Sequence, residues 1–469
     1  MATLSTPDLC IIGAGASGLA VAEAAQRFGA SVAIVEKAEP GGASQRAGSL
    51  AMSALSAAAR YAAAPARAAA FGVTLDTPAV SMRKVHDHIA EVLRHAAPQG
   101  GAARIEALGI ELLRGAAVFT SPKALQVGDA TIEAKKYVIA TGARPTLPDI
   151  PGLFGVPYFT TETIFDNTRR LAHLAIVGAG PLGLELALSY RRLGSAVTVI
   201  DSGHALPQSD PELAEIALRR CRDEGIALIE DAAILAVQAR SEGLALSLSV
   251  GGEPQTLEAS HLLVAVGRTP NLDDLGLDVA KVRRAPNHGG LQLGPTLRTS
   301  NSRVYAVGEA AGHLTHLSAI EADTVVRAAL HGKAQPYEPA LLPRLTLTDP
   351  PIAEIGMTEP TARVRLKGGY TVLRASYAEN DLARANRDGM GLIKLVLGKA
   401  GRIIGAGIVG AGAGELAAFF ALAMADNRDA ASLYLLPSSH PILANLVEVL
   451  GAQARGPEKR PTLLNRLLP

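Results

Sequence analysis

A glycine-rich turn occurs twice in this chain, each time between an apolar run and a segment rich in helix formers. The first copy follows Leu9 to Ile12 and reads Gly13-Ala14-Gly15-Ala16-Ser17-Gly18. The second follows Leu174 to Val177 and reads Gly178-Ala179-Gly180-Pro181-Leu182-Gly183. A second apolar run follows each helical segment and ends on an acid, at Glu36 and at Asp201. Each copy therefore predicts strand, tight turn, helix and strand, so we expect an α/β fold with two Rossmann-like nucleotide-binding units.

The three glycines of such a motif have separate physical roles. The first permits the tight turn, the second lets the backbone approach a pyrophosphate, and the third lets the helix pack closely on the strand. The helix N-terminus then directs its unpaired amides at the phosphates. One copy alone is a weak signal, because glycine turns arise wherever a strand reverses into a helix. Two copies with matched acids indicate that dinucleotides bind.

Glu36 and Asp201 stand where a carboxylate accepts hydrogen bonds from ribose hydroxyls. A 2′-phosphate would be repelled there, and the residues from Ser202 to Leu213 include no arginine or lysine to neutralise it. We therefore expect NADH rather than NADPH in the second unit. The alternative interpretation of Asp201 is a solvated acid at a strand end.

Length and charge limit the class of protein. A chain of 469 residues with 48% hydrophobic residues is expected to form two or three domains. Its 45 basic and 44 acidic residues give a net charge of +1, so neither nucleic acid nor an anionic membrane is an expected partner. The two cysteines, Cys10 and Cys221, are far apart, which argues against a disulfide framework or a metal site and favours a cytoplasmic location. Glycines interrupt the apolar stretches Cys10 to Ala22 and Gly405 to Ala425, so neither a signal peptide nor membrane insertion is expected.

Two further segments show local patterns. The alanine-rich stretch Ala51 to Ala70, interrupted by Pro65, favours a helix over a low-complexity segment. Ile393 to Leu397 and Ile403 to Val409 are β-branched runs that flank a glycine turn, which predicts two paired strands. We therefore expect an α+β domain after about residue 335.

Several motifs resemble the pyridine nucleotide-disulfide oxidoreductase family, in its dihydrolipoamide dehydrogenase and mercuric reductase branch. Tyr137 to Pro145 (YVIATGARP) and Val264 to Pro270 (VAVGRTP) are similar to its two ATG-type motifs. Val304 to Glu309 (VYAVGE) is similar to the segment that reaches the flavin ribityl chain, with glutamate in place of the usual aspartate. The dimerisation domain is matched by Pro350 to Glu359 (PPIAEIGMTE), Asn380 to Ala385 (NDLARA) and Arg402 to Gly410 (RIIGAGIVG).

The resemblance implies an FAD domain from residues 1–151 and 275–336, an NAD domain from 152–274, and a C-terminal dimerisation domain from 337–469. It also implies a homodimer, because each active site of the family borrows residues from the partner's C-terminal domain. The FAD contacts that it implies are Gly13, Gly15, Ala16, Ser17, Gly18, Glu36, Lys37, Gly42, Ala43, Ser44, Thr141, Gly142, Glu309 and Thr315. The NAD contacts that it implies are Gly178, Gly180, Pro181, Leu182, Gly183, Asp201 and Gly267.

The family's redox disulfide is absent from the sequence. Relatives carry GGxCxxxGCxPSK after the first acid, whereas this chain has Ser44 and Ser49 at the two thiol positions. A serine hydroxyl forms no disulfide and is too weak an acid to act as a thiolate would. Cys10 lies within the first predicted strand and Cys221 on a predicted helix, and we expect both to be buried and inert. Dithiol chemistry is therefore not expected.

Two other family positions are altered. The lysine that pairs with a glutamate near the flavin is replaced by Ser53, while the glutamate is kept as Glu185. Either Arg46 takes the place of that lysine, or Glu185 ionises less readily than usual. The family's His-Pro-x-x-x-Glu pair becomes His440-Pro441-Ile442-Leu443-Ala444-Asn445, so we expect His440 to lack a carboxylate partner. His440 then either donates a proton to an acceptor or forms a hydrogen bond at the dimer interface.

These residues support a leading function and two alternatives. The first is an NADH-dependent flavin reductase whose electrons go to a small acceptor, such as a quinone or oxygen, near Ser44, Ser49 and His440. The second is a flavin-bound protein without turnover that acts as a structural or sensing partner. The third is a disulfide reductase with displaced thiols. The intact second glycine motif favours the flavin reductase. A protein that did not bind NADH would have no evident structural reason to keep this motif complete.

Overall fold

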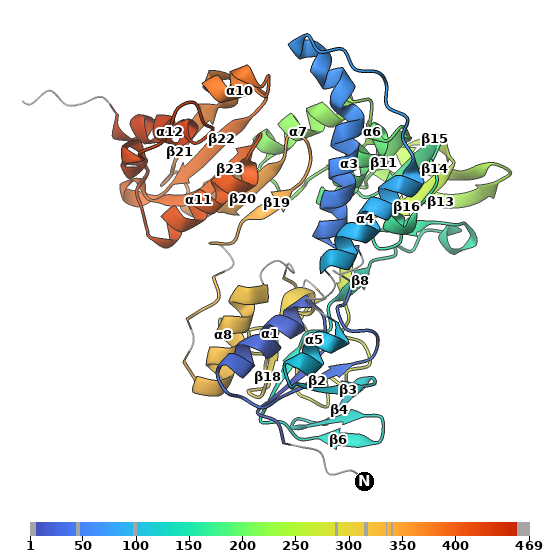
Figure 1. Cartoon of the computed structure of the whole chain (residues 1–469), viewed down its shortest axis with the longest axis vertical. Coiled ribbons are helices and arrows are strands. Elements are labelled where there is room, and N and C mark those ends of the chain that lie inside the picture. Colours follow the sequence, from blue (N-terminus) through green and yellow to red (C-terminus); the bar gives the residue numbers. More distant parts are fainter. Residues whose placement is uncertain are drawn as a thin grey trace, which may run out of the picture. The chain divides into compact units, whose positions relative to one another are not determined.

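The computed structural model describes residues 6–43, 47–96, 101–286, 289–313, 318–333, 335–338 and 341–456 (Figure 1). They form two compact units. The first contains Met1–Ser202 and Ala227–Glu338, and the second contains Gly203–Ile226 and Pro339–Pro469. Both units combine helices with β-sheets, in agreement with the predicted fold class.

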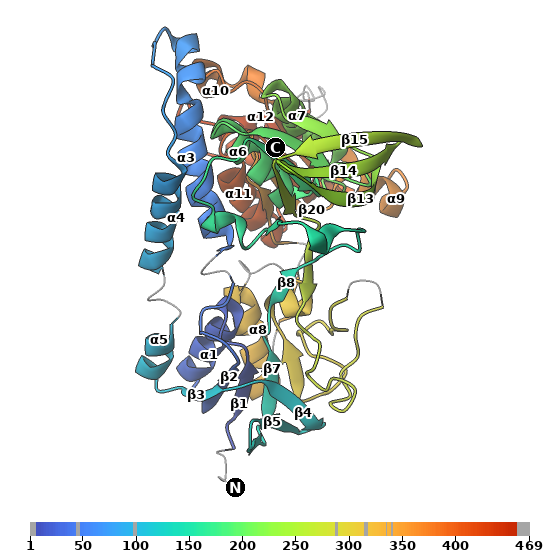
Figure 2. The same cartoon turned by 90° about the vertical axis from the view of Figure 1, so that its right-hand side faces the viewer.

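A five-stranded parallel sheet forms the N-terminal part of the first unit. Its strands, in spatial order, are β18 (Val304–Ala306), β7 (Lys136–Ile139), β1 (Leu9–Ile12), β2 (Val32–Glu36) and β3 (Glu111–Arg114). The inner strands β7, β1 and β2 are mostly buried apolar runs because both faces of the sheet are covered, whereas the edge strand β3 begins and ends on exposed charged residues. Helices α1 (Ala16–Arg27) and α8 (Ser318–His331) lie side by side, as Figure 2 shows. Side chains of the other face pack on the small antiparallel sheet β4 (Ala117–Ser121), β5 (Ala124–Val127) and β6 (Ala130–Ile132).

A second five-stranded parallel sheet repeats this plan. Its order is β12 (Ala227–Ile229), β11 (Ala196–Ile200), β10 (His173–Val177), β16 (His261–Val264) and β9 (Phe159–Thr160). Helix α6 (Pro181–Arg192) packs on β10 and β11. Apolar side chains of the other face pack on the antiparallel strands β13 (Ala232–Arg240), β14 (Gly243–Val250) and β15 (Glu253–Ala259). The chain runs from the first sheet to the second after β7 and returns after β16. These two connecting segments pair with each other as the short antiparallel strands β8 (Ala143–Pro145) and β17 (Arg268–Pro270).

The alanine-rich segment is helical, as predicted. Helix α3 (Ser49–Ala68) contains Pro65 in its last turn. A proline so close to the end of a helix disturbs few of its backbone hydrogen bonds. Helix α3 packs on α4 (Met82–Ala96) and on α6, and the short helix α5 (Ala102–Ala107) follows α4. Helix α3, which follows the first glycine motif and β2 in the sequence, therefore packs against α6, the helix of the second glycine motif.

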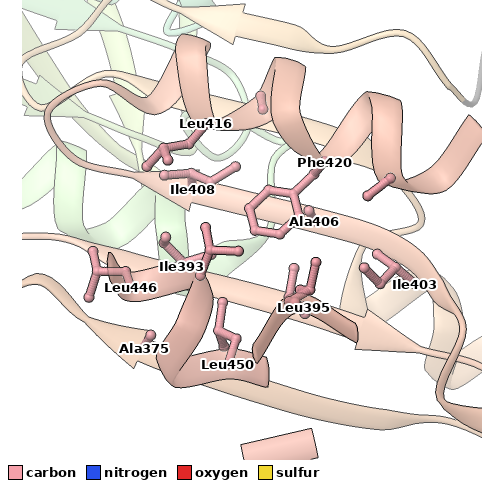
Figure 3. Close-up of a cluster of buried hydrophobic side chains, with 14 of the residues drawn as sticks. Ala375, Ile393, Leu395, Ile403, Ala406, Ile408, Leu416, Phe420, Leu446 and Leu450 are labelled. Atoms are coloured by element: carbon pink, nitrogen blue, oxygen red, sulfur yellow. The ribbon is translucent and has the colours of Figure 1, made fainter. Parts of the chain in front are cut away.

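The second unit is built on an antiparallel sheet. Its order is β19 (Arg344–Thr346), β20 (Ile352–Gly356), β23 (Ile403–Val409), β22 (Leu392–Leu397) and β21 (Thr371–Ser376). Because side chains alternate along a strand, Ile393 and Leu395 share one face and Lys394 points to the other. The apolar face packs on α11 (Ala413–Ala425) and α12 (Asn445–Arg455) in the core shown in Figure 3. Helix α7 (Pro211–Asp223) contacts β20 and β23, and α9 (Glu359–Leu366) and α10 (Asp381–Ala385) follow β20 and β21 along the chain.

Candidate functional site

The first glycine motif forms a turn that only glycine fits at its first and third positions. Gly13 has a φ of +110°, and a Cβ there would lie 2.3 Å from the carbonyl oxygen of Ala140. A Cβ on Gly18 would lie 2.0 Å from the carbonyl oxygen of Gly13, so the close approach of α1 to β1 requires its absence. At Gly15 the nearest atom to such a Cβ is 4.0 Å away, the Cα of Gly42. The middle glycine therefore leaves open backbone before the N-terminus of α1, where a pyrophosphate fits.

The second motif repeats these contacts at the carboxyl edge of the other sheet. Gly178 has a φ of +113°, and a Cβ there would lie 2.5 Å from the carbonyl oxygen of Ala265. A Cβ on Gly183 would lie 2.1 Å from the carbonyl oxygen of Gly178, whereas one on Gly180 would meet nothing within 4 Å. Pro181 is the first residue of α6, where its missing N–H has no cost, and the next residue is the half-buried Leu182. Both turns thus share one geometry.

The two acids take equivalent positions beside these turns. The backbone N–H of Ala14 donates to Oε2 of Glu36 at 2.8 Å, and the N–H of Ala179 donates to Oδ2 of Asp201 at 2.7 Å. The second oxygen of Glu36 accepts from the N–H of Ala38 at 2.8 Å. Each carboxylate is held against its glycine turn at the carboxyl end of a parallel strand, which is where α/β sheets bind ribose.

Glu309 lies beside an arginine that the sequence prediction did not single out. Nε of Arg268 lies 2.7 Å from Oε1 of Glu309, and Nη2 lies 2.8 Å from Oε1 of Glu162. The first contact is an ion pair without a directed hydrogen bond, since Nε–H has no hydrogen-bond partner within the described ranges. Nη2 also donates to the carbonyl oxygen of Ala143 at 2.7 Å. Burial raises the pKa of the Glu309 carboxyl, and the Arg268 guanidinium opposes that rise. Arg268 therefore favours the ionised form, which accepts hydrogen bonds from hydroxyl groups.

The segment around Glu309 is fixed by a buried carboxylate. The N–H of Gly308 donates to Oε2 of the fully buried Glu321 at 2.6 Å. Oε1 of Glu321 lies 2.8 Å from Nδ1 of His313 and accepts from the hydroxyl of Tyr337 at 3.2 Å. A Cβ on Gly308 would lie 2.4 Å from Oγ of Ser17, so the first glycine motif and the Glu309 turn are in direct contact.

The remaining predicted FAD contacts differ in their surroundings. Thr141 donates its hydroxyl to the carbonyl oxygen of Asn271 at 2.7 Å, and Gly142 accepts from the N–H of Asn271 at 2.9 Å. Ala16 begins α1, Gly42 and Ala43 are half-buried after β2, and Lys37 is exposed. Ser44 and Thr315 lie outside the described residues, and the predicted NAD contact Gly267 is exposed with a φ of +113°.

These features fit the two cofactors that the sequence predicts. The glycine turns leave room where phosphates bind, and the carboxylates stand where ribose and ribityl hydroxyls need acceptors. The hydroxyl of Thr161, which is 4% exposed at the carboxyl end of β9, finds no hydrogen-bond partner in the described part of the chain. A buried hydroxyl of this kind is expected to meet a ligand or a water molecule.

The positions of the lost thiols lie close in sequence to the start of α3. Ser49 is the first residue of this helix and is exposed, as is Ser53. Glu185 is buried in α6, against which α3 packs. Arg46, which we considered as a replacement for the family's lysine, lies outside the described residues. That hypothesis remains a prediction.

His440 has a carboxylate neighbour, so the expectation that it lacks one is wrong. Its Nε2 lies 3.1 Å from Oδ2 of Asp381, the first residue of α10. Asn445 instead accepts from the N–H of Ile442 at 2.9 Å and donates to the carbonyl oxygen of Ser439 at 3.0 Å. Asp381 was missed because it is 59 residues away in the sequence, although it lies within the NDLARA motif.

Both cysteines are buried, as predicted. Cys10 lies in β1 and Cys221 in α7, and each is 0% exposed. Burial raises the pKa of the Cys10 thiol to about 12, so it carries no thiolate near neutral pH. No group of three or more histidine, cysteine or acidic side chains among the described residues is arranged to hold a metal ion. Likewise, none of the described helices is long and apolar enough to cross a bilayer.

Comparison with known proteins identifies two regions of the chain. Residues 7–332 match the family model described as pyridine nucleotide-disulphide oxidoreductase, and residues 342–454 match the dimerisation domain of that family. The second match supports a homodimer.

The chain is similar to several reductases over most of its length. It is 34% identical to a mercuric reductase of Streptomyces lividans, over 87% of this chain and 88% of that protein. It is 29% identical to a dihydrolipoyl dehydrogenase of Geobacillus stearothermophilus, over 94% of each chain. The solved structure of RclA, an HOCl-induced flavoprotein disulfide reductase from Escherichia coli, has a TM-score of 0.82 at 23% identity and covers 96% of this chain and 99% of that one. This structural likeness concerns the fold alone.

Proposed function

The chain belongs to the pyridine nucleotide-disulphide oxidoreductase family, and we propose that it is an FAD-dependent NADH oxidoreductase whose electrons pass to an acceptor other than a disulfide. The observation that carries this proposal is a contrast within one chain. Both glycine turns and both acids are in place, whereas Ser44 and Ser49 occupy the positions of the redox thiols. The chain thus keeps the residues proposed to bind FAD and NADH, and it lacks the disulfide that accepts electrons from the flavin in the family.

We assign the first glycine turn, Glu36 and Glu309 to FAD, and the second turn and Asp201 to NADH. When bound, FAD accepts a hydride from the nicotinamide and passes two electrons to the acceptor. Glu36 and Asp201 would each hold a ribose, and Glu309, whose ionised form Arg268 favours against the effect of burial, would hold ribityl hydroxyls. The preference for NADH is supported by the absence of arginine and lysine from Ser202 to Leu213.

The acceptor in this proposal is a small molecule such as a quinone or oxygen. Neither Cys10 nor Cys221 is suited to replace the missing thiols, because both are fully buried. A hydroxyl at Ser49 is exposed but cannot exchange electrons. A cytoplasmic location, supported by the sparing use of cysteine, belongs to the same proposal.

An anaerobic titration of the FAD-loaded protein tests this function. The chain has no tryptophan, and the visible flavin band reports FAD alone. We expect NADH to bleach that band stoichiometrically, and NADPH to do so only at much higher concentration. Indifference to both nucleotides would instead favour a flavin-bound structural or sensing protein. Rapid reoxidation by lipoamide, with slow reoxidation by quinone and oxygen, would point to a disulfide reductase.

A further inference from the structure

One edge of the first unit carries positive charge that ion pairs do not neutralise. It is the edge at which the strands of the first parallel sheet begin, and the first glycine turn lies at the opposite end of these strands. Two basic residues near this edge are paired, Lys135 with Asp8 and Arg284 with Asp273. The others form no ion pair within the described ranges, and we call the surface that they make the basic edge: Lys123, Lys136, Lys281, Arg283, Arg298 and Arg303.

The register of the sheet brings Lys136 and Arg303 together. Lys136 begins β7, and Arg303 is the residue before β18, the parallel neighbour of β7. The N–H of Tyr137 donates to the carbonyl oxygen of Arg303 at 2.8 Å, and Nζ of Lys136 donates to that of Ser302 at 3.1 Å. Arg298 lies on the other side of β18, in an antiparallel bridge. Burial lowers the pKa of the Lys136 ammonium, and the guanidinium groups of Arg303 and Arg298 lower it further, so the three charges lie within reach of one another.

Asn301 fixes two more segments to the basic edge. Its Nδ2 donates to the carbonyl oxygens of Pro122 and Ala280, at 2.9 Å and 2.7 Å. The next residue in each segment is a lysine, Lys123 in one and Lys281 in the other. The oxygen of the same amide accepts from the backbone N–H just before β18 at 2.9 Å. One side chain therefore gathers cations from three parts of the chain.

Ser300 holds Arg283 at the same place. Its Oγ accepts from the N–H of Arg283 at 2.9 Å and donates to the carbonyl oxygen of Lys281 at 2.9 Å. These contacts use backbone atoms of both residues and leave their charged side chains exposed. The exposed acids Glu133 and Asp278 are close in sequence, and they balance only a part of the positive charge.

The composition of the basic edge favours an anionic lipid surface over other anionic partners. Interfaces between proteins usually have an apolar or aromatic centre from which charged residues are depleted, and the basic edge has the opposite composition. Tyr137 and Tyr305, the aromatic residues of β7 and β18, are buried, so neither ring is exposed for stacking on nucleic acid bases. The glycine turn that we assign to FAD lies at the other end of these strands. An anionic bilayer attracts basic segments by charge alone.

We propose that the basic edge binds the surface of a membrane that contains anionic lipids. The net charge of +1, from which no such partner was expected, averages over the whole chain and does not report this local surplus. With the amino edge of the sheet against lipid, the first glycine turn lies at the far end of the sheet from the membrane. The inference does not depend on the proposed function.

Sedimentation of the FAD-loaded protein with sucrose-filled vesicles tests this proposal. We expect the wild type to bind vesicles that contain about 30% phosphatidylglycerol in phosphatidylcholine, and not vesicles of phosphatidylcholine alone. Binding should weaken as salt rises from about 0.1 M to about 0.5 M. The triple variant Lys136→Gln, Arg298→Gln, Arg303→Gln should bind about 100-fold more weakly, because each cation near an anionic surface contributes roughly fivefold.

A matched control removes the same charge from the second unit. Arg365→Gln, Lys367→Gln and Lys399→Gln are changes at exposed positions, and together they should leave binding unchanged. The charge-keeping variant Arg298→Lys with Arg303→Lys should also bind like the wild type, because a lipid surface requires charge rather than a fixed fork of donors.

A second variant keeps the test valid if the first triple variant folds poorly. Lys281→Gln with Arg283→Gln changes two exposed side chains and leaves the backbone contacts of Ser300 in place. It should weaken binding to the acidic vesicles about 25-fold, by the same roughly fivefold contribution of each cation.

Each result decides the proposal, and none of the measurements involves NADH or an electron acceptor. Failure of the wild type to bind acidic vesicles at low salt, or equal binding to both kinds of vesicle, would overturn it. Equal losses in the two triple variants would also overturn it, because overall charge and not the basic edge would then be responsible. Tighter binding to duplex DNA than to the vesicles would assign the basic edge to nucleic acid instead.

Discussion

Arg268 is the residue on which the charge state of the candidate flavin site depends. It contacts Glu309 and Glu162 and is 25% exposed, while the Glu309 carboxyl is buried enough for its pKa to rise. An ionised carboxylate accepts two hydroxyl hydrogen bonds, whereas a protonated one must donate its own hydrogen. The arginine therefore decides how well Glu309 serves as an acceptor near neutral pH.

We predict that Arg268→Met weakens FAD binding about tenfold at pH 7, which corresponds to ~1.4 kcal/mol. Without the guanidinium the pKa of Glu309 rises further, so the loss of affinity should grow as the pH is lowered and shrink as it is raised, over a range from pH 9 down to pH 6. The dissociation constant is measured from the fluorescence of released FAD across this range. Arg268→Lys should retain most of the affinity, and Arg363→Met, at an exposed arginine of α9, is the control. A loss of affinity that is independent of pH would contradict this account.

At the scale of elements, a buried lysine joins α7 to the antiparallel sheet. Lys394 of β22 is 5% exposed, and its Nζ lies 2.9 Å from Asp210, 2.8 Å from Glu212 and 2.7 Å from Glu359. Arg374 of β21 completes the cluster with a second contact to Glu212 and Glu359. The cluster lies on the sheet face opposite the core of Figure 3, because Lys394 alternates with Ile393 and Leu395.

We predict that Lys394→Met lowers the free energy of unfolding by about 3 to 5 kcal/mol, because it leaves buried Asp210 without its countercharge. Thermal unfolding of the FAD-loaded protein, followed by calorimetry, should show a lower temperature for one transition. Lys399→Met removes an exposed lysine from the turn after β22 and should have little effect. Equal shifts in the two variants would show that the cluster is not needed for stability.

Glu212 makes the same cluster sensitive to acid. The hydrogen bonds from Arg374 lower its pKa from 4.5 to about 2, and Lys394 adds to this effect. A carboxyl whose folded pKa is depressed stabilises the fold above its unfolded pKa, and this contribution is lost as pH falls toward the folded pKa. We therefore predict that Glu212→Gln is less stable than the wild type at pH 6 and that the difference shrinks between about pH 4.5 and pH 2. Urea unfolding at stepped pH measures it, and a constant difference would contradict the assignment.

Local sequence patterns predicted several helices and strands. The placement of these elements and the pairing of distant side chains depend on long-range contacts that the patterns do not show. The strands β22 and β23 and the helix α3 are evident from residue spacing alone. The placement of α7 in the second unit is not evident from residue spacing. It involves the contact between Lys394 and Asp210, the N-cap residue of α7, and these two residues are 184 positions apart in the sequence. The same limit hid Asp381 from His440 and Arg268 from Glu309, since side-chain pairing across loops leaves no periodic signal. The predicted FAD and NAD domain boundaries remain a prediction.

For the whole molecule, the described residues hold no second redox group to share electrons with FAD. Cys10 and Cys221 are buried in β1 and α7, and the pKa of Cys10 is raised to about 12, so no thiolate lies ready to contact a flavin. We predict that an anaerobic dithionite titration reduces the protein fully with two electrons per FAD. A member of the family with a redox disulfide requires four, because the disulfide takes two of its own. No long-wavelength band from a thiolate beside the flavin should appear during the titration. A dihydrolipoyl dehydrogenase titrated in parallel gives the reference. An uptake of four electrons per FAD would show that the dimer contains a redox-active disulfide. It would overturn the claim that the chain, with Ser44 and Ser49 at the thiol positions, carries out no dithiol chemistry.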